Sequence, residues 1–237
     1  MEEPENHLSF SNLRKMLQQI SDQQENSQII VATHNNMIAS RLNLNNVLWI
    51  TEDGVKSLKG VKSDVAEFFV RADDNAFLQL LLSKKVILVE GATEFLLLPM
   101  FYKQTTDHTI EEDGISVISC NGISYKRYLE IAKATDKRIA VVTDNDEKSD
   151  RIAEVASFNQ ANDLQHIFMG ATVDEWTWEA CIYKENKDTL DGMIDVQAGA
   201  AYKFHDKDYG AVLGKMLNHK VDVAYQMLTS GKTFAVP

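Results

Sequence analysis

Short apolar runs and segments with helical spacing alternate along the second half of the chain. From Lys84 onward, runs rich in β-branched residues are each followed by a segment whose apolar positions recur every three or four residues. The expected strands cover residues 86–89, 115–119, 138–143 and 166–169, and the expected helices include 93–103, 125–134 and 208–228. Strands that alternate with helices predict a doubly wound, mainly parallel α/β sheet.

The first of these runs ends in an acidic turn. Its four apolar residues are followed by Glu90, and Gly91 then permits a tight turn into the next helix. Thr93 is expected to cap that helix, and Glu94 falls in its first turn near the positive end of the helix dipole. Ligands of open α/β sheets gather beyond the carboxyl ends of the strands, where Glu90 is expected to lie.

A second run ends in the same way. The strand over residues 138–143 is followed by Asp144, Asn145 and Asp146, and the single spacer allows both aspartates to reach one cation. Adjacent strands lie about 5 Å apart, so Glu90 and this pair converge if their strands are neighbours. Hard divalent cations such as Mg²⁺ prefer carboxylate oxygens of this kind.

The N-terminal third has a different pattern. The pair Glu2-Glu3 precedes a helix over residues 8–20, and a strand over residues 28–33 ends at His34. A further short strand covers residues 47–50, and helices are expected between residues 61 and 83. No phosphate-binding loop of the form G-x-x-x-x-G-K-[ST] occurs in the sequence, so this chain alone is not expected to turn over ATP.

Composition narrows the class of protein. The chain has 237 residues, of which 44% are apolar, enough for one or two globular units with a core. Its net charge of −11 argues against a surface coated for nucleic acid, although a metal-holding acidic cluster would contribute to that balance. Cys120 and Cys181 give neither a metal-ligand spacing nor a disulfide framework, so a reducing cytoplasm is expected. We recognise no signal peptide and no apolar run near the ~20 residues that span a bilayer, so no membrane partner is expected.

The motifs in the two parts of the chain resemble those of known protein families. A Glu-Gly strand end followed 54 residues later (144 − 90) by an Asp-x-Asp strand end resembles the Toprim domain of topoisomerases, primases and nucleases. Glu2-Glu3 resembles the end of a Walker B strand in an ABC-type ATPase, and His34 resembles the switch histidine that contacts the γ-phosphate. In this order, the two parts resemble the OLD (overcoming lysogenization defect) nucleases, a group that includes the nuclease subunit of Gabija anti-phage systems.

The resemblance implies roles for individual residues. It implies two divalent ions, Mg²⁺ or Mn²⁺, held by four acids: Glu90, Glu94, Asp144 and Asp146. Glu179 is implied as a further metal ligand because it matches a later Thr-Leu-Glu-like element, which departs from the pattern at Trp178. Lys232 matches the active-site lysine of a Lys-x-Phe-Ala element. In the ATPase remnant, Glu2 matches the magnesium-directed carboxylate and Glu3 the water-polarising one. Whether Glu90 holds a metal or acts as general base stays open.

The same resemblance predicts domains and partners. Residues 1–60 are expected to be the C-terminal remnant of an ABC-type ATPase domain, 61–83 a helical linker and 84–237 the Toprim nuclease domain. The expected function is metal-dependent cleavage of DNA in anti-phage defence or DNA processing, regulated by an ATPase domain that is largely missing from this chain. ATP in the full-length protein, a homodimer or higher oligomer, and a helicase-like partner subunit are also implied.

Three other interpretations fit parts of the sequence. A haloacid-dehalogenase-like phosphatase would use Asp144 as nucleophile, but that family places the motif on its first strand, and Glu147-Lys148 follow it here. A non-catalytic Toprim DNA-binding scaffold is disfavoured because all four main acids are present. A receiver domain accounts poorly for Glu90 and Glu94.

Overall fold

The computed structural model describes residues 1–6, 8–22, 28–35, 38, 46–51, 54–72, 76–120, 124–197, 203–204 and 207–237. The chain divides into two compact units, which we describe separately. The N-terminal unit comprises Met1–Ser83 and Lys126–Lys137, and the sheet unit comprises Lys84–Tyr125 and Arg138–Pro237.

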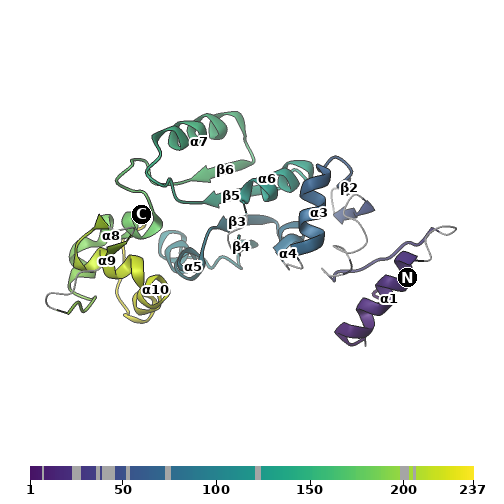
Figure 1. Cartoon of the computed structure of the whole chain (residues 1–237), viewed down its shortest axis with the longest axis horizontal. Helices are drawn as coiled ribbons and strands as arrows, with labels where there is room; N and C mark the ends of the chain where they lie inside the picture. The colour runs from purple at the N-terminus through teal and green to yellow at the C-terminus, as the bar shows by residue number, and fades with distance from the viewer. Residues whose placement is uncertain are drawn as a thin grey trace. The chain divides into compact units, whose positions relative to one another are not determined.

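A four-stranded parallel sheet forms the centre of the sheet unit (Figure 1). Its strands are β3 (Lys85–Val89), β4 (Ile115–Ser119), β5 (Arg138–Val142) and β6 (Gln165–Phe168), in the order β4-β3-β5-β6. In the central pair, Val89 lies opposite Val142, so the residues that follow these two strands meet at one edge. The parallel sheet in a mixed α/β unit confirms the fold class that the alternating pattern predicted.

The central strand β3 is apolar on both faces, as its unbroken apolar run predicted. Val86 and Leu88 are buried on one face. On the other face, Val89 packs with Val117 of β4 and with Leu98 of the helix α5 (Ala92–Thr106). This packing fixes the carboxyl end of β3 beneath the start of α5. Helix α7 (Ser149–Ala161) connects β5 to β6.

A helical layer follows the sheet along the chain. It contains α8 (Trp178–Asp191), α9 (Ala211–Asn218) and α10 (Lys220–Thr229), with the short strands β7 (Lys203–Phe204) and β8 (Lys207–Asp208) between α8 and α9. These helices share an apolar core with α5 that includes Leu97, Ile182 and Met227. The single helix predicted over residues 208–228 is wrong, because His219 leaves the helical conformation (φ −129°, ψ 45°) and separates α9 from α10.

Four helices and a hairpin are found in the described part of the N-terminal unit. These are α1 (Phe10–Asp22), α3 (Ser63–Ala72), α4 (Ala76–Leu82) and α6 (Tyr125–Ala134), with an antiparallel hairpin of β1 (Leu48–Thr51) and β2 (Gly54–Ser57). Of the strand predicted over residues 28–33, Ala32 forms a parallel bridge with Glu2. Among the described residues of both units, no helix combines the length and apolar character needed to cross a membrane.

Candidate metal centre

Glu90 meets the end of the neighbouring strand. Because Val89 pairs with Val142, Glu90 is level with Thr143, and the Thr143 hydroxyl donates to Oε2 of Glu90 at 2.7 Å. The backbone N–H of Asp144 donates to the same oxygen at 3.3 Å. The Glu90 carboxylate therefore lies over the end of β5, as the sequence predicted for neighbouring strands.

Asp144 lies at the start of helix α8. Its Oδ1 accepts the backbone N–H of Trp178 at 2.9 Å, and Trp178 is the first residue of that helix. An unpaired N–H at a helix N-terminus is a favourable partner for a carboxylate. Thr177 caps the helix by accepting the N–H of Ala180. This contact joins the end of β5 to the helix that carries Glu179.

Glu94 lies in the first turn of α5 and is 5% exposed. Its Oε2 accepts the N–H of Gly91, the residue that caps the helix. A Cβ at position 91 would lie 3.2 Å from that oxygen, so the Glu94 carboxylate would have to shift to admit any other residue. The predicted capping role of Thr93 is wrong, because the helix already begins at Ala92 and Thr93 is buried within its first turn.

Glu179 is 2% exposed and pairs with a lysine that the sequence argument missed. Oε2 of Glu179 accepts hydrogen bonds from Nζ of Lys220 at 2.8 Å and from the Thr177 hydroxyl at 3.1 Å. Lys220 is the first residue of α10. A lysine at a helix N-terminus opposes the dipole, but the single helix predicted over residues 208–228 puts Lys220 in a helix interior, so no sequence signal identified it.

We call five residues the acidic cluster: Glu90, Glu94, Asp144, Glu179 and Lys220. The charges of these residues affect one another's pKa values. Burial raises the pKa of Asp144 to about 7, and the charges of Glu179 and Glu90 add to the increase against the opposing effects of the Trp178 N–H and Lys220. Burial also raises the pKa of Glu94, with a contribution from Glu179. Burial acts to lower the pKa of Lys220, but Glu179 and then Asp144 and Glu94 outweigh it and raise that pKa. Lys220 therefore remains a cation at neutral pH.

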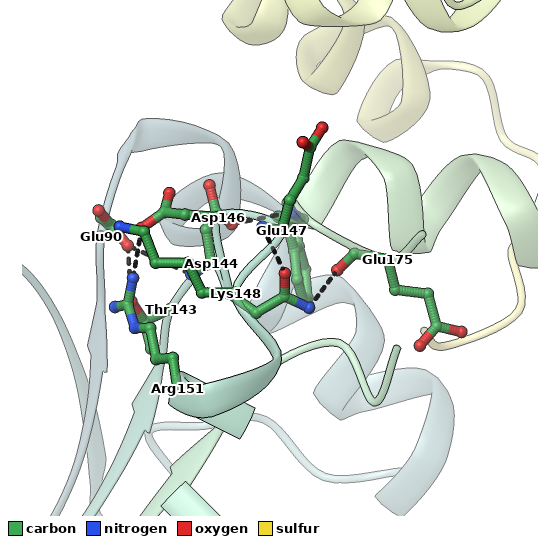
Figure 2. A network of polar contacts seen from close by, with 10 residues as sticks. Glu90, Thr143, Asp144, Asp146, Glu147, Lys148, Arg151 and Glu175 are labelled. Carbon is green, nitrogen blue, oxygen red and sulfur yellow. Dashed lines mark hydrogen bonds and ion pairs between the residues drawn. The ribbon is translucent and has the colours of Figure 1, made fainter. Parts of the chain in front are cut away.

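Asp146 lies beside the acidic cluster with partners of its own. The turn after β5 places Asp146 and Glu147 in the left-handed region, with φ of 54° and 61°. The Asp146 carboxylate pairs with Arg151 at 2.5 Å and with Lys148 at 3.8 Å. Figure 2 shows Glu147 pointing away from Arg151. Asp146 is therefore held by cations at the same strand end that carries Asp144.

Lys232 lies in the C-terminal segment and is exposed. Its backbone N–H bonds to the Ser230 hydroxyl, and nearby Phe234 is buried in the core shared by α5, α8, α9 and α10. Ala235 exchanges two hydrogen bonds with the side chain of Asn186. The segment is thus anchored, but the cation in the acidic cluster is Lys220.

The residues that resemble an ATPase lie together in the N-terminal unit. Glu2 forms a parallel bridge with Ala32, and this bridge puts Glu3 level with Thr33, the residue before His34. Nδ1 of His34 is 3.2 Å from Oε1 of Glu3 and 3.9 Å from Glu5. The backbone therefore brings Glu3 and the predicted switch histidine into contact, although thirty-one residues (34 − 3) separate them.

The carboxylates of the acidic cluster are the right chemical type to bind a hard divalent cation, but they are not arranged around a single metal position. Carboxylate oxygens are donors that Mg²⁺ and Mn²⁺ prefer, and a bound cation would favour the ionised form of Asp144 and Glu94, whose pKa values burial raises. Across the described ranges, no three acidic, histidine or cysteine side chains are grouped so that they could hold a metal ion as they stand. Lys220 pairs with Glu179 and Arg151 pairs with Asp146, so these two carboxylates already have cationic partners.

Acids follow both central strands of the parallel sheet, Glu90 after β3 and Asp144 after β5. Residues 81–146 match the family model described as "Overcoming lysogenization defect protein-like, TOPRIM domain". The chain therefore carries an OLD-like Toprim domain, which confirms the family predicted from the sequence and indicates a function in nucleic-acid processing.

Solved structures of two OLD proteins resemble the chain at low identity. The C-terminal region of the Burkholderia pseudomallei OLD protein is 17% identical, with a TM-score of 0.39, and the match covers 63% of this chain and 84% of that one. The C-terminal region of the Xanthomonas campestris pv. campestris OLD protein is 16% identical, with a TM-score of 0.36, and the match covers 62% and 73%. At these values the domain assignment rests on the family model and the sheet. Comparison with curated proteins gives no match.

Proposed function

We propose that this chain is a metal-dependent DNA endonuclease whose site is the acidic cluster together with Asp146. The observation that carries the proposal is the convergence of Glu94, Asp144 and Glu179 from three separate elements around Lys220, with Glu90 beside Asp144. Carboxylates repel one another when buried together, and a divalent cation would remove that repulsion. Such a set is costly in a fold and is typical of a functional site.

The residues would divide the work between binding and charge neutralisation. Glu90, Glu94, Asp144, Asp146 and Glu179 would hold two divalent ions, which supply an activated water and stabilise the oxygens of a phosphodiester displacement. Asp144 also fixes the start of α8, so it would orient Glu179 as well as bind. The Lys220 ammonium would neutralise charge that develops on the phosphate as a point charge with rotatable donors.

We further propose that the N-terminal unit belongs to an ATPase that regulates the nuclease. Contact between Glu3 and His34 supports this, because the two types of residue both face the γ-phosphate in the ATPases that this segment resembles. DNA as substrate, a homo-oligomer, a helicase-like partner and a role in anti-phage defence complete the proposal. They rest on the family resemblance of the domain.

Plasmid cleavage tests the proposed chemistry. Supercoiled DNA is incubated with the chain and Mg²⁺ or Mn²⁺, with EDTA as the metal-free control. We expect nicked or linear product from wild type and at least a hundredfold slower cleavage by Asp144→Asn. Glu154→Gln changes an exposed acid on α7 and serves as the matched control. Equal cleavage by wild type and Asp144→Asn would refute the proposed site.

The phosphatase interpretation predicts a different result from the same proteins. An Asp144 nucleophile would hydrolyse a small phosphate monoester such as p-nitrophenyl phosphate, and Glu90→Gln would retain that activity. The nuclease proposal expects no monoester hydrolysis that depends on Asp144. It expects loss of DNA cleavage when either Glu90 or Asp144 is changed.

A further inference from the structure

Arg151 makes a hydrogen bond in addition to its ion pair with Asp146. One guanidinium nitrogen, Nη1, bonds to Asp146, and the other, Nη2, donates to the hydroxyl of Thr143 at 2.9 Å (Figure 2). The Arg151 side chain is 23% exposed, and Thr143 is 4% exposed. The guanidinium therefore reaches past Asp146 to a buried neutral group.

The Thr143 hydroxyl bonds to both Arg151 and Glu90. A guanidinium carries only donors, so the hydroxyl oxygen must accept there and has one proton left to donate. That proton is directed at Oε2 of Glu90, 2.7 Å away. The direction of the hydroxyl is thus fixed by Arg151.

The consequence for Glu90 is that its two oxygens have different surroundings. The Thr143 hydroxyl and the Asp144 N–H both donate to Oε2. Oε1 is then the oxygen that this arrangement presents to a ligand. The Thr143 backbone is also fixed, because its N–H donates to the carbonyl of Phe168, the last residue of β6, at 3.0 Å.

We propose that Thr143 and Arg151 are positioning residues that orient the Glu90 carboxylate for a divalent cation. This inference rests on the proposed function and names residues that no motif of the sequence singled out. Groups that hydrogen-bond a metal-binding carboxylate restrict its rotation, and their loss typically weakens metal affinity by about 10–100-fold. Arg151 would couple two acids, because the same guanidinium that fixes Thr143 also holds Asp146.

The test is Mn²⁺ binding by the full chain, measured by isothermal titration calorimetry. Thr143→Val keeps the side-chain shape but removes the hydroxyl, and we expect it to weaken Mn²⁺ binding about 10–100-fold. Thr143→Ser keeps the hydroxyl and is expected to bind within about threefold of wild type, as is the control Glu154→Gln. Arg151→Met is also expected to weaken Mn²⁺ binding. The double variant Thr143→Val/Arg151→Met should bind Mn²⁺ as well as whichever single variant binds it less tightly, because both residues act through the same chain of contacts.

The outcomes separate this inference from the proposed function. Wild-type affinity in both Thr143→Val and Arg151→Met would overturn the positioning role while leaving the metal site intact. Equal weakening in Thr143→Ser and Thr143→Val would also overturn it, because the hydroxyl would not be the operative group. If wild type bound no Mn²⁺, the proposed function would fail and this inference with it. Arg151→Met decides the matter should Thr143→Val fail to fold.

Discussion

Nζ of Lys220 lies 2.8 Å from Oε2 of Glu179, although forty-one residues separate them in the chain. Glu179 is 2% exposed, so its charge has lost most of its contact with water and depends on this partner. The pair joins α8 to α10 within the acidic cluster. It supplies that cluster with a cation, while the active-site role that the family resemblance implies for Lys232 stays a prediction.

Replacing Lys220 tests which lysine serves the site. We expect Lys220→Met to slow plasmid cleavage by about 10²–10³-fold, because a charge directed at the reacting phosphate is removed. Lys232→Met is the matched comparison, and we expect the smaller effect from this exposed residue. A larger loss in Lys232→Met than in Lys220→Met would return the catalytic role to Lys232.

The stability of the same variant has a separate cause. Lys220→Met leaves Glu179 buried without its cation, and we expect a loss of about 1–3 kcal/mol in the free energy of unfolding, since Lys220 itself is partly exposed. Adding Glu179→Gln should recover most of that stability without restoring cleavage. Urea unfolding of the single and double variants measures this. Recovery of cleavage in the double variant would contradict the role given to both residues.

Asn145 connects the end of β5 to the loop before α8. Its side chain is 0% exposed, and its amide nitrogen donates to the carbonyls of three loop residues: Gly170 at 3.0 Å, Thr172 at 2.8 Å and Glu175 at 3.2 Å. We expect Asn145→Asp to destabilise the fold by about 2–4 kcal/mol, because an oxygen would face three carbonyls that have lost their donor. Asn162→Asp, at the more open end of α7, is the control. A denaturation midpoint unchanged by Asn145→Asp would refute this account of the loop.

Lys137 gives the N-terminal unit a dependence on pH. It is 5% exposed and donates to the carbonyls of Leu81 and Ser83. Burial, with a smaller effect from Lys56, lowers its pKa to about 8. The unfolded chain then binds more protons between pH 8 and about 10.5, so this group makes stability rise with pH across that window.

The variant Lys137→Met isolates that contribution. We expect the free energy of unfolding of wild type to increase relative to that of Lys137→Met as the pH rises from 8 to 10. Urea unfolding of both proteins measures this difference. A difference that stays constant over this range would show that Lys137 titrates normally.

ATP turnover is not expected from this chain as it stands. The sequence lacks a G-x-x-x-x-G-K-[ST] loop, and the contact of His34 with Glu3 supplies no phosphate cradle of its own. Phosphate release with ATP should therefore equal the rate without protein. Turnover that Glu3→Ala abolishes would contradict this expectation.

The sequence predicted those features that depend on local pattern. The run Val86–Val89 identified a strand buried on both faces, and the acids that follow it and β5 identified the edge where the cluster forms. Lys220 could not be predicted, because its contact with Glu179 depends on how α8 and α10 pack. The break at His219 was missed for a related reason, since apolar spacing continues across it.

Thr143 and Asn145 show a further limit of sequence patterns. Both residues lie in or beside the Asp-x-Asp motif, yet a motif records only which acids are present. Their roles follow from partners on other elements, Arg151 on α7 and the loop before α8. Contacts of that kind become visible only when the elements are placed in space.

The most direct test of the central claim is a crystal structure of the chain soaked with Mn²⁺, using anomalous scattering to locate the ions. We expect a manganese peak within roughly 2–2.6 Å of carboxylate oxygens from both Glu90 and Asp144. We also expect this peak to be lost in Glu90→Gln. Manganese bound elsewhere, with both carboxylates still unliganded, would contradict the claim that these acids form one metal centre.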